Sequence, residues 1–312
     1  MNLTAHYWTL APSISHRFRP PPDHGAKPWQ VSVPDARFGS VAISGLVRIH
    51  PGARAIVLIV HGMGGRPSSH YAVRAAAAAE RAGLSTLRIA LRGADRRGED
   101  FYHAGLTVDL HAALESPEVR GHEAVYILGY SLGGHVSLRL ALEPHRAPLR
   151  AVAVVCPPLD LVACAHALDN TVPWFYRQYV LGGLKSIYAQ VAKRRPVPSP
   201  VADVLRVTTV RDWDRLAVVP RHGFESPDAY YHGESVAWRL KDLAIPSLVV
   251  ACDNDPMVPM QSVRDAVRSA SPALEARYTS RGGHVAFPRE LDLGMPGSKG
   301  LEDQLMSWLL KH

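Results

Sequence analysis

Short apolar runs rich in β-branched residues alternate along this chain with segments whose apolar residues recur at helical spacing. Runs of this length and composition are typical of buried strands. Strands are predicted over residues 29–33, 40–47, 55–60, 84–90, 124–128, 149–155, 246–251 and 274–279. Helices are predicted over residues 71–82, 107–114, 134–142, 262–269 and 301–310. This alternation indicates an α/β protein with a mostly parallel sheet and helices on both faces.

Two parts of the chain depart from the alternation. The chain begins with a proline-rich segment that includes residues 20–22, and we expect an irregular lead-in followed by two antiparallel strands. Residues 157–240 contain helical patterns over 159–168 and 173–191 but no convincing core strand. We interpret this stretch as a helical lid inserted into the core. The predicted organisation is an N-terminal part of the core, the lid and a C-terminal part of the core, at 1–156, 157–240 and 241–312.

Composition excludes several classes of protein. The 312 residues are 47% hydrophobic and 20% charged, which is ordinary for a globular protein. The net charge of +7 and the pI near 9.4 come from scattered arginines, with one tight basic cluster at 193–195. No zinc-ligand pattern or aromatic-basic motif accompanies this cluster, so it predicts solvated surface charge and no nucleic-acid partner.

The cysteines and the lengths of the apolar runs indicate the cellular compartment of the protein. Cys156, Cys164 and Cys252 form no paired framework, which favours reduced thiols in a cytoplasmic protein. Residues 1–29 lack the apolar core of a signal peptide. No apolar run approaches the roughly 20 residues that a membrane helix needs, so we expect no integral membrane segment.

The strongest chemical signal is the sequence Gly-Tyr-Ser-Leu-Gly at 129–133, which lies between a predicted strand and a predicted helix. In this context the pattern predicts a nucleophile elbow, with Ser131 at the apex of a sharp turn. Side chains at Gly129 and Gly133 would collide with the neighbouring backbone. A chance turn between strand and helix is the alternative, and the flanking elements disfavour it.

A serine hydroxyl needs a base, and the base needs an orienting acid. Of the sixteen histidines, His284 is best placed, because it lies in a glycine-rich loop after the last predicted strand. His61 and His135, which flank the proposed site in sequence, are the next candidates. The acid should follow the strand that ends at residue 251, where Asp253 and Asp255 share one turn. The sequence does not decide between these two by geometry, and either could instead be a turn residue.

Acyl transfer chemistry also needs two backbone N–H groups that bind an oxyanion. One follows the nucleophile, at Leu132. The other is expected in the sequence His-Gly-Met-Gly-Gly at 61–65, most plausibly at Met63. Read alone, this glycine-rich stretch is only a turn at the end of a strand.

These motifs together resemble the α/β-hydrolase superfamily over nearly the whole chain, and within it the YheT-type hydrolases related to the eukaryotic ABHD proteins. The matching segments are 61–65, 91–93, 102–110, 129–134, 157–161, 223–224, 230–231, 255–256 and 282–285. The resemblance implies an α/β-hydrolase fold with a helical lid and a Ser-Asp-His hydrolase that cleaves esters without a cofactor or metal. It also favours Asp255 over Asp253. Departures from the family pattern at 95–100 and 210–214 bear on substrate choice.

The predicted function is therefore a serine hydrolase that cleaves a small-molecule or lipid-like carboxylic ester through an acyl-enzyme. An acyltransferase or a thioesterase would use the same triad, and a non-catalytic ligand-binding protein on this fold is a third reading. Aromatic residues of the lid are candidates to line an apolar acyl pocket, although such residues are more often core packing. These candidates are Phe175, Tyr176, Tyr179, Phe224 and Tyr231.

Overall fold

The structure, a computed structural model, describes residues 3–18 and 25–312 and is built around one eight-stranded sheet. The strand order is β1-β2-β4-β3-β5-β6-β7-β8. The strands are β1 (Lys27–Asp35), β2 (Gly39–Arg48), β3 (Ala55–Val60), β4 (Ser85–Ile89), β5 (Ala124–Tyr130), β6 (Leu149–Val155), β7 (Ser247–Cys252) and β8 (Leu274–Thr279). The β1–β2 and β2–β4 pairs are antiparallel, and the other neighbouring pairs are parallel. The predicted fold class and the antiparallel start are confirmed.

Helices cover both faces of the sheet, and β3 shows how the sequence provides for this. All six of its residues are buried, and successive side chains point to opposite faces. Ile56 and Leu58 join one apolar cluster, whereas Val57 and Ile59 join the other. The first cluster packs against α3 (Val108–Leu114), α5 (Leu132–Ala141) and α12 (Met260–Arg268), and the second against α2 (His70–Arg81) and α13 (Leu301–Leu309). Truncating a buried leucine such as Leu58 to alanine would cost about 2–5 kcal/mol.

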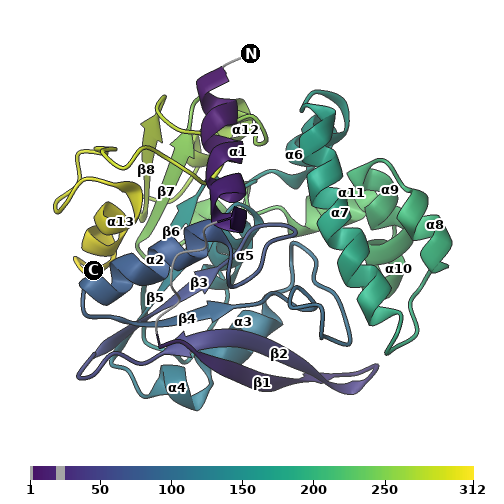
Figure 1. Cartoon of the computed structure of the whole chain (residues 1–312), viewed down its shortest axis with the longest axis horizontal. Coiled ribbons are helices and arrows are strands. Elements are labelled where there is room, and N and C mark those ends of the chain that lie inside the picture. The colour runs from purple at the N-terminus through teal and green to yellow at the C-terminus, as the bar shows by residue number, and fades with distance from the viewer. Residues whose placement is uncertain (1–2, 19–24) are drawn as a thin grey trace.

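The segment between β6 and β7 is helical, and Figure 1 shows its helices grouped beside the sheet in teal and green. The helical patterns predicted over residues 159–168 and 173–191 correspond to α6 and α7. The helices of this segment are α6 (Leu161–Asn170), α7 (Trp174–Val191), α8 (Val201–Arg206), α9 (Val210–Trp213), the π-helix η1 (Asp214–Val218), α10 (Val219–His222), α11 (Pro227–Glu234) and the 3-10 helix η2 (Leu240–Asp242). A short helix, α4 (Pro117–Arg120), precedes β5.

The expectation of an irregular lead-in is wrong for residues 3–18, which form α1 (Leu3–Phe18) with Pro12 inside it. An interior proline costs a helix about 3 kcal/mol, so the sequence disfavours this helix. Contacts with three distant segments offset that cost. His16 bonds the carbonyl of Ser68 at 2.8 Å, and His6 bonds the hydroxyl of Tyr176 at 2.8 Å. The third contact, with the loop that follows β8, is described with the site; prolines 20–22 lie outside the described residues.

One further expectation concerns membranes. Within residues 3–18 and 25–312, no helix combines the length and the apolar character that crossing a bilayer requires.

Candidate active site

Ser131 lies at the sharp turn between β5 and α5. Its backbone has φ 51° and ψ −123°, a conformation that residues with a side chain rarely adopt and that costs about 1–3 kcal/mol. The surroundings explain the flanking glycines. A Cβ on Gly129 would lie 2.5 Å from the Cα of Gly134, and one on Gly133 would lie 2.4 Å from the carbonyl oxygen of Val60. Ser131 therefore lies in a sharp turn between strand and helix, and the close backbone contacts at Gly129 and Gly133 leave no room for side chains there.

Ser131, His284 and Asp255 form a hydrogen-bonded chain. His284 Nε2 lies 2.9 Å from Ser131 Oγ, and His284 Nδ1 lies 2.8 Å from Asp255 Oδ2. The side chains of His284 and Asp255 are 7% and 2% exposed. Asp253, the other candidate acid, instead pairs with Arg264 at 2.6 Å on the surface. The structure thus places Asp255 against the histidine and Asp253 away from it.

The remaining oxygen of Asp255 fixes the orientation of the carboxylate. Asp255 Oδ1 accepts hydrogen bonds from the backbone N–H groups of Met257 at 2.8 Å and Val258 at 3.1 Å. Because both donors belong to the turn after β7, the carboxylate is held with Oδ2 toward His284. A proton on His284 Nδ1 then leaves Nε2 as an acceptor for the hydroxyl of Ser131.

The loop that carries His284 is held against α1. The backbone N–H of His284 donates to Thr9 Oγ1 at 2.9 Å. A Cβ on Gly283 would lie 2.3 Å from the carbonyl oxygen of Ala5, so helix and loop touch through their backbones. Val285 has φ 60°, an uncommon value for a β-branched residue, which shows that this loop is tightly constrained. Sequence reasoning missed the part of α1 in this contact.

The glycine-rich loop at 61–65 lies beside Ser131, as predicted. A Cβ on Gly62 would be 2.9 Å from Ser131 Cβ. Tyr71 and Tyr102 hydroxyls accept from the N–H groups of Gly62 and Gly64, at 3.0 Å and 2.8 Å. The N–H of Gly65 bonds the carbonyl of Gly62 at 3.0 Å.

The two amides expected to bind an oxyanion lie in this region. No hydrogen bond occupies the amide of Met63 within the part of the chain that the structure describes. Leu132 is the first residue of α5, where helix amides lack an intrahelical acceptor. Both residues line the same cavity as Ser131 and His284.

The alternative bases His61 and His135 are engaged elsewhere. The ring nitrogens of His61 lie 2.8 Å from the carbonyl oxygen of Gly62 and 3.1 Å from the backbone nitrogen of Leu91. Those of His135 lie 2.8 Å and 3.0 Å from the carbonyl oxygens of Pro158 and Glu234. Burial lowers the pKa of both imidazoles to about 4. Neither ring has a nitrogen available to accept the proton of Ser131.

Cys156 shares the environment of the histidine–aspartate pair. Its sulfur and the donor atoms of Asp255 and His284 lie within 4.8 Å of one another, a spacing that could hold a metal ion. The chemistry of the donors fits a metal poorly. Burial raises the pKa of the Cys156 thiol well above its usual value, so the metal-binding thiolate is disfavoured. Both nitrogens of His284 are already hydrogen-bonded.

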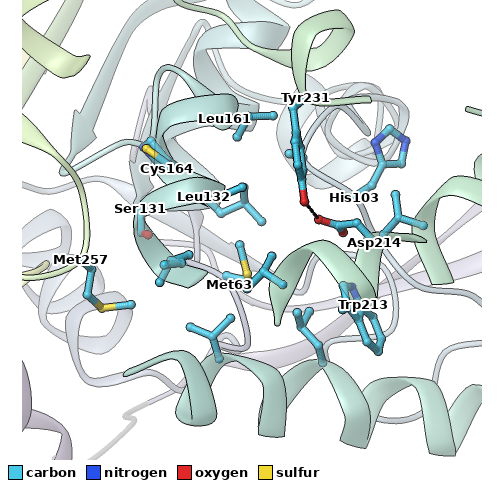
Figure 2. A pocket seen from close by; sticks show the side chains of 18 of the residues that line it. Met63, His103, Ser131, Leu132, Leu161, Cys164, Trp213, Asp214, Tyr231 and Met257 are labelled. Carbon is cyan, nitrogen blue, oxygen red and sulfur yellow. Dashed lines mark hydrogen bonds between the residues drawn. The ribbon is translucent and has the colours of Figure 1, made fainter. Parts of the chain in front are cut away.

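Ser131 opens onto a cavity with mostly apolar walls (Figure 2). Helices α6, α7, α9 and η1 supply much of the lining. Apolar side chains on these walls include Leu161, Cys164, Ala165, Leu168, Val180, Leu184, Val210, Trp213 and Val218.

Of the five aromatic residues expected to line such a pocket, Tyr231 does and four do not. Phe175 and Tyr179 are 37% and 66% exposed, because they lie off the face of α7 that carries Val180 and Leu184 inward. Tyr176 is buried against His6 of α1 instead. Phe224 packs on Tyr230, behind the wall of the cavity.

A hydrogen-bonded polar pair lies among the mostly apolar walls, and sequence reasoning missed it. Tyr231 donates a hydrogen bond to Asp214 Oδ2 at 2.6 Å, and both side chains line the cavity. Burial raises the pKa of Asp214 to about 7. The sequence signals were present separately, as the double tyrosine at 230–231 and the acidic stretch at 210–214. Nothing in their spacing shows that the two segments meet.

Comparisons with known proteins identify the family and the fold. The model of the alpha/beta hydrolase family matches residues 56–292. "Putative esterase YheT" of Escherichia coli is 30% identical over 238 residues, which cover 74% of this chain and 70% of that protein. Human "Phospholipase ABHD3" is 24% identical over 244 residues, 75% of this chain and 59% of that protein. The solved esterase Pf2001 of Pyrococcus furiosus superposes with a TM-score of 0.54 at 15% identity, covering 83% of this chain and 84% of that one.

Proposed function

Because the chain belongs to the alpha/beta hydrolase family, we propose that Ser131, His284 and Asp255 are the catalytic triad of an ester-cleaving hydrolase. The observation that carries the proposal is the unbroken hydrogen-bonded chain from Ser131 Oγ to Asp255. This chain starts at a strained elbow and opens onto an apolar cavity.

The geometry supports the following steps. His284 Nε2 takes the proton of Ser131 as the hydroxyl attacks the ester carbonyl. Asp255 holds the imidazolium that forms, and the amides of Met63 and Leu132 donate to the oxyanion. His284 then protonates the departing alcohol and activates the water that hydrolyses the acyl-enzyme.

We further propose that residues 157–240 act as a lid over this site, between core parts at 1–156 and 241–312. The helices of that segment supply much of the cavity wall, whereas Ser131 and His284 belong to the sheet and its loops. The apolar wall suits an acyl or alkyl chain, and a substrate that is a small-molecule or lipid-like ester. Relatives named phospholipase and monoacylglycerol lipase fit this substrate class.

Labelling with a fluorophosphonate probe tests the nucleophile. We expect the native protein to be labelled at Ser131, and Ser131→Ala to lose both labelling and hydrolysis of a p-nitrophenyl ester. Ser307→Ala is the matched control, because its hydroxyl bonds a carbonyl within α13, away from the cavity. Labelling of Ser131→Ala at native strength would refute the assignment.

Product analysis separates hydrolysis from transfer. When an acceptor alcohol is added to the ester substrate, we expect the free acid to remain the main product. When a thiol ester of the same acyl group is supplied as a competing substrate, we expect the oxygen ester still to be cleaved. A product that is mainly a new ester would make the protein an acyltransferase, and a strong preference for thiol esters would make it a thioesterase.

A further inference from the structure

The polar pair Asp214–Tyr231 in the cavity wall has no part in the triad chemistry. Figure 2 shows it on the opposite side of the view from Ser131, with the hydrogen bond between the two side chains drawn as a dashed line. Asp214 is the first residue of the π-helix η1. Helices of this type are rare and frequently occur at functional sites. Tyr231 lies in α11, so two separate helices bring the pair together.

The carboxyl group of Asp214 is left short of hydrogen bonds. The side chain is buried, with 6% exposure, and a carboxylate offers about four acceptor positions. Within the described residues, Tyr231 is its one hydrogen-bond donor. Burying a polar group without enough partners is costly, and such groups therefore call for an explanation. The open side of this carboxyl is the cavity that it lines.

We propose that Asp214 and Tyr231 recognise a hydroxyl group of the substrate, so that esters carrying a hydroxyl are preferred over plain alkyl esters of equal length. This inference rests on the proposed ester cleavage at Ser131. A hydroxyl can donate to the free acceptor positions of Asp214, whereas a plain chain fills the same space and leaves them empty. Val218 beside the pair is apolar, and among the polar lining residues His103, Trp213 and Tyr230 none carries a carboxyl group that could accept from a hydroxyl as Asp214 can.

The protonation behaviour of the pair fits a neutral ligand. Burial raises the pKa of Asp214 to about 7, so near neutral pH the carboxyl is present in both forms. The protonated form can donate as well as accept, and the ionised form only accepts. Both forms therefore have a hydrogen bond to offer a hydroxyl. A site for a cationic group would instead hold its carboxylate ionised.

The discriminating measurement is the ratio of kcat/KM for an ω-hydroxy ester to kcat/KM for its plain alkyl counterpart. Two substrate pairs locate the recognised group, one with the hydroxyl on the acyl chain and one with it on the alcohol. Hydrogen bonds to charged groups contribute about 1.5–3 kcal/mol, which at about 1.36 kcal/mol per factor of ten predicts a ratio of about 10 to 160 in one of the two pairs. The release of acid, measured in a pH-stat, gives the hydrolysis rate of both substrates by the same method.

Asp214→Leu should bring that ratio to about one while plain esters are still hydrolysed. If that variant does not fold, Tyr231→Phe replaces it. This substitution removes the hydroxyl that holds the Asp214 carboxyl and belongs to the recognising pair, so it should also lower the ratio. Tyr188→Phe is the matched control, because Tyr188 is equally buried but donates to the carbonyl of Ser199, outside the cavity. Its ratio should equal that of the native protein.

Two results would overturn the inference. One is a ratio near one for both substrate pairs in a native protein that hydrolyses the plain esters. The other is an ester with an ammonium group that outcompetes its hydroxyl counterpart. Failure of the proposed function looks different, since then no ester is cleaved and Ser131 is not labelled.

Discussion

Asp255→Asn tests the proposed triad most sharply, because the structure fixes what the new amide must do. The amide oxygen takes the place of Oδ1, which accepts from the N–H groups of Met257 and Val258. The amide NH₂ then faces His284 Nδ1 across the 2.8 Å contact that the carboxylate makes now. Two N–H groups cannot bond each other, so Nδ1 must become the acceptor. The ring proton moves to Nε2, which then cannot take the proton of Ser131.

The expected fall in kcat follows from the free energy needed to restore the proton to Nδ1, which requires the amide of the Asn variant to rotate. Rotating the amide would place NH₂ against two backbone N–H groups, leaving both without an acceptor, at about 1–3 kcal/mol each. A total of about 2–6 kcal/mol corresponds to a fall in kcat of about 30- to 10⁴-fold, at about 1.36 kcal/mol per factor of ten.

Steady-state hydrolysis of a p-nitrophenyl ester measures this effect, with thermal unfolding to show that the variant is folded. Asp253→Asn is the matched control. It breaks a surface pair with Arg264, and such pairs contribute about 0–1 kcal/mol, so its kcat should change less than about fivefold. The reasoning is refuted if Asp253→Asn loses as much activity as Asp255→Asn, or if Asp255→Asn keeps native kcat.

Two further substitutions test the surroundings of the site. Gly283→Ala places a Cβ 2.3 Å from the carbonyl oxygen of Ala5; we expect it to lower kcat and to expose α1 to limited proteolysis, and an unchanged cleavage rate in α1 would count against the contact. Asp214→Asn tests the buried carboxyl through the pH dependence of unfolding. Because the pKa of Asp214 is raised from 3.8 to about 7, the folded state binds more protons than the unfolded state between these values. The unfolding free energy of the native protein should therefore fall by up to about 4 kcal/mol as pH rises through this window, and the Asn variant should lack that part of the fall.

The sheet and the elbow could be predicted because local pattern decides them. β3 is buried along its whole length and reads as a continuous apolar run. Ser131 is marked by glycines that the neighbouring backbone requires. His284 and the pair of candidate acids followed from the order of residues along the chain. The choice between Asp253 and Asp255 depends on where a turn points its side chains, which the sequence does not show.

The features that escaped prediction depend on contacts between distant segments. The helix α1 contains Pro12 and is held by His6, Thr9 and His16, whose partners lie far along the chain. The Asp214–Tyr231 pair joins two helices of a segment with no sheet to set its register. The sequence suggests Phe175 and Tyr179 for the acyl pocket, but both are exposed, because the sequence does not show how α7 is rotated about its axis.

The contact between His284 and Thr9 has a consequence for when the site can form. It joins residues 275 positions apart, and the hydrogen bond between Ser131 and His284 spans 153. A chain emerging from the ribosome at about 5–20 residues per second places its first helix in solution long before the loop that must dock on it. Such distant contacts carry a large loop-closure entropy and form late. In a refolding experiment, the rate at which esterase activity returns should therefore report the docking of the loop that carries His284, and not the earlier collapse of the sheet.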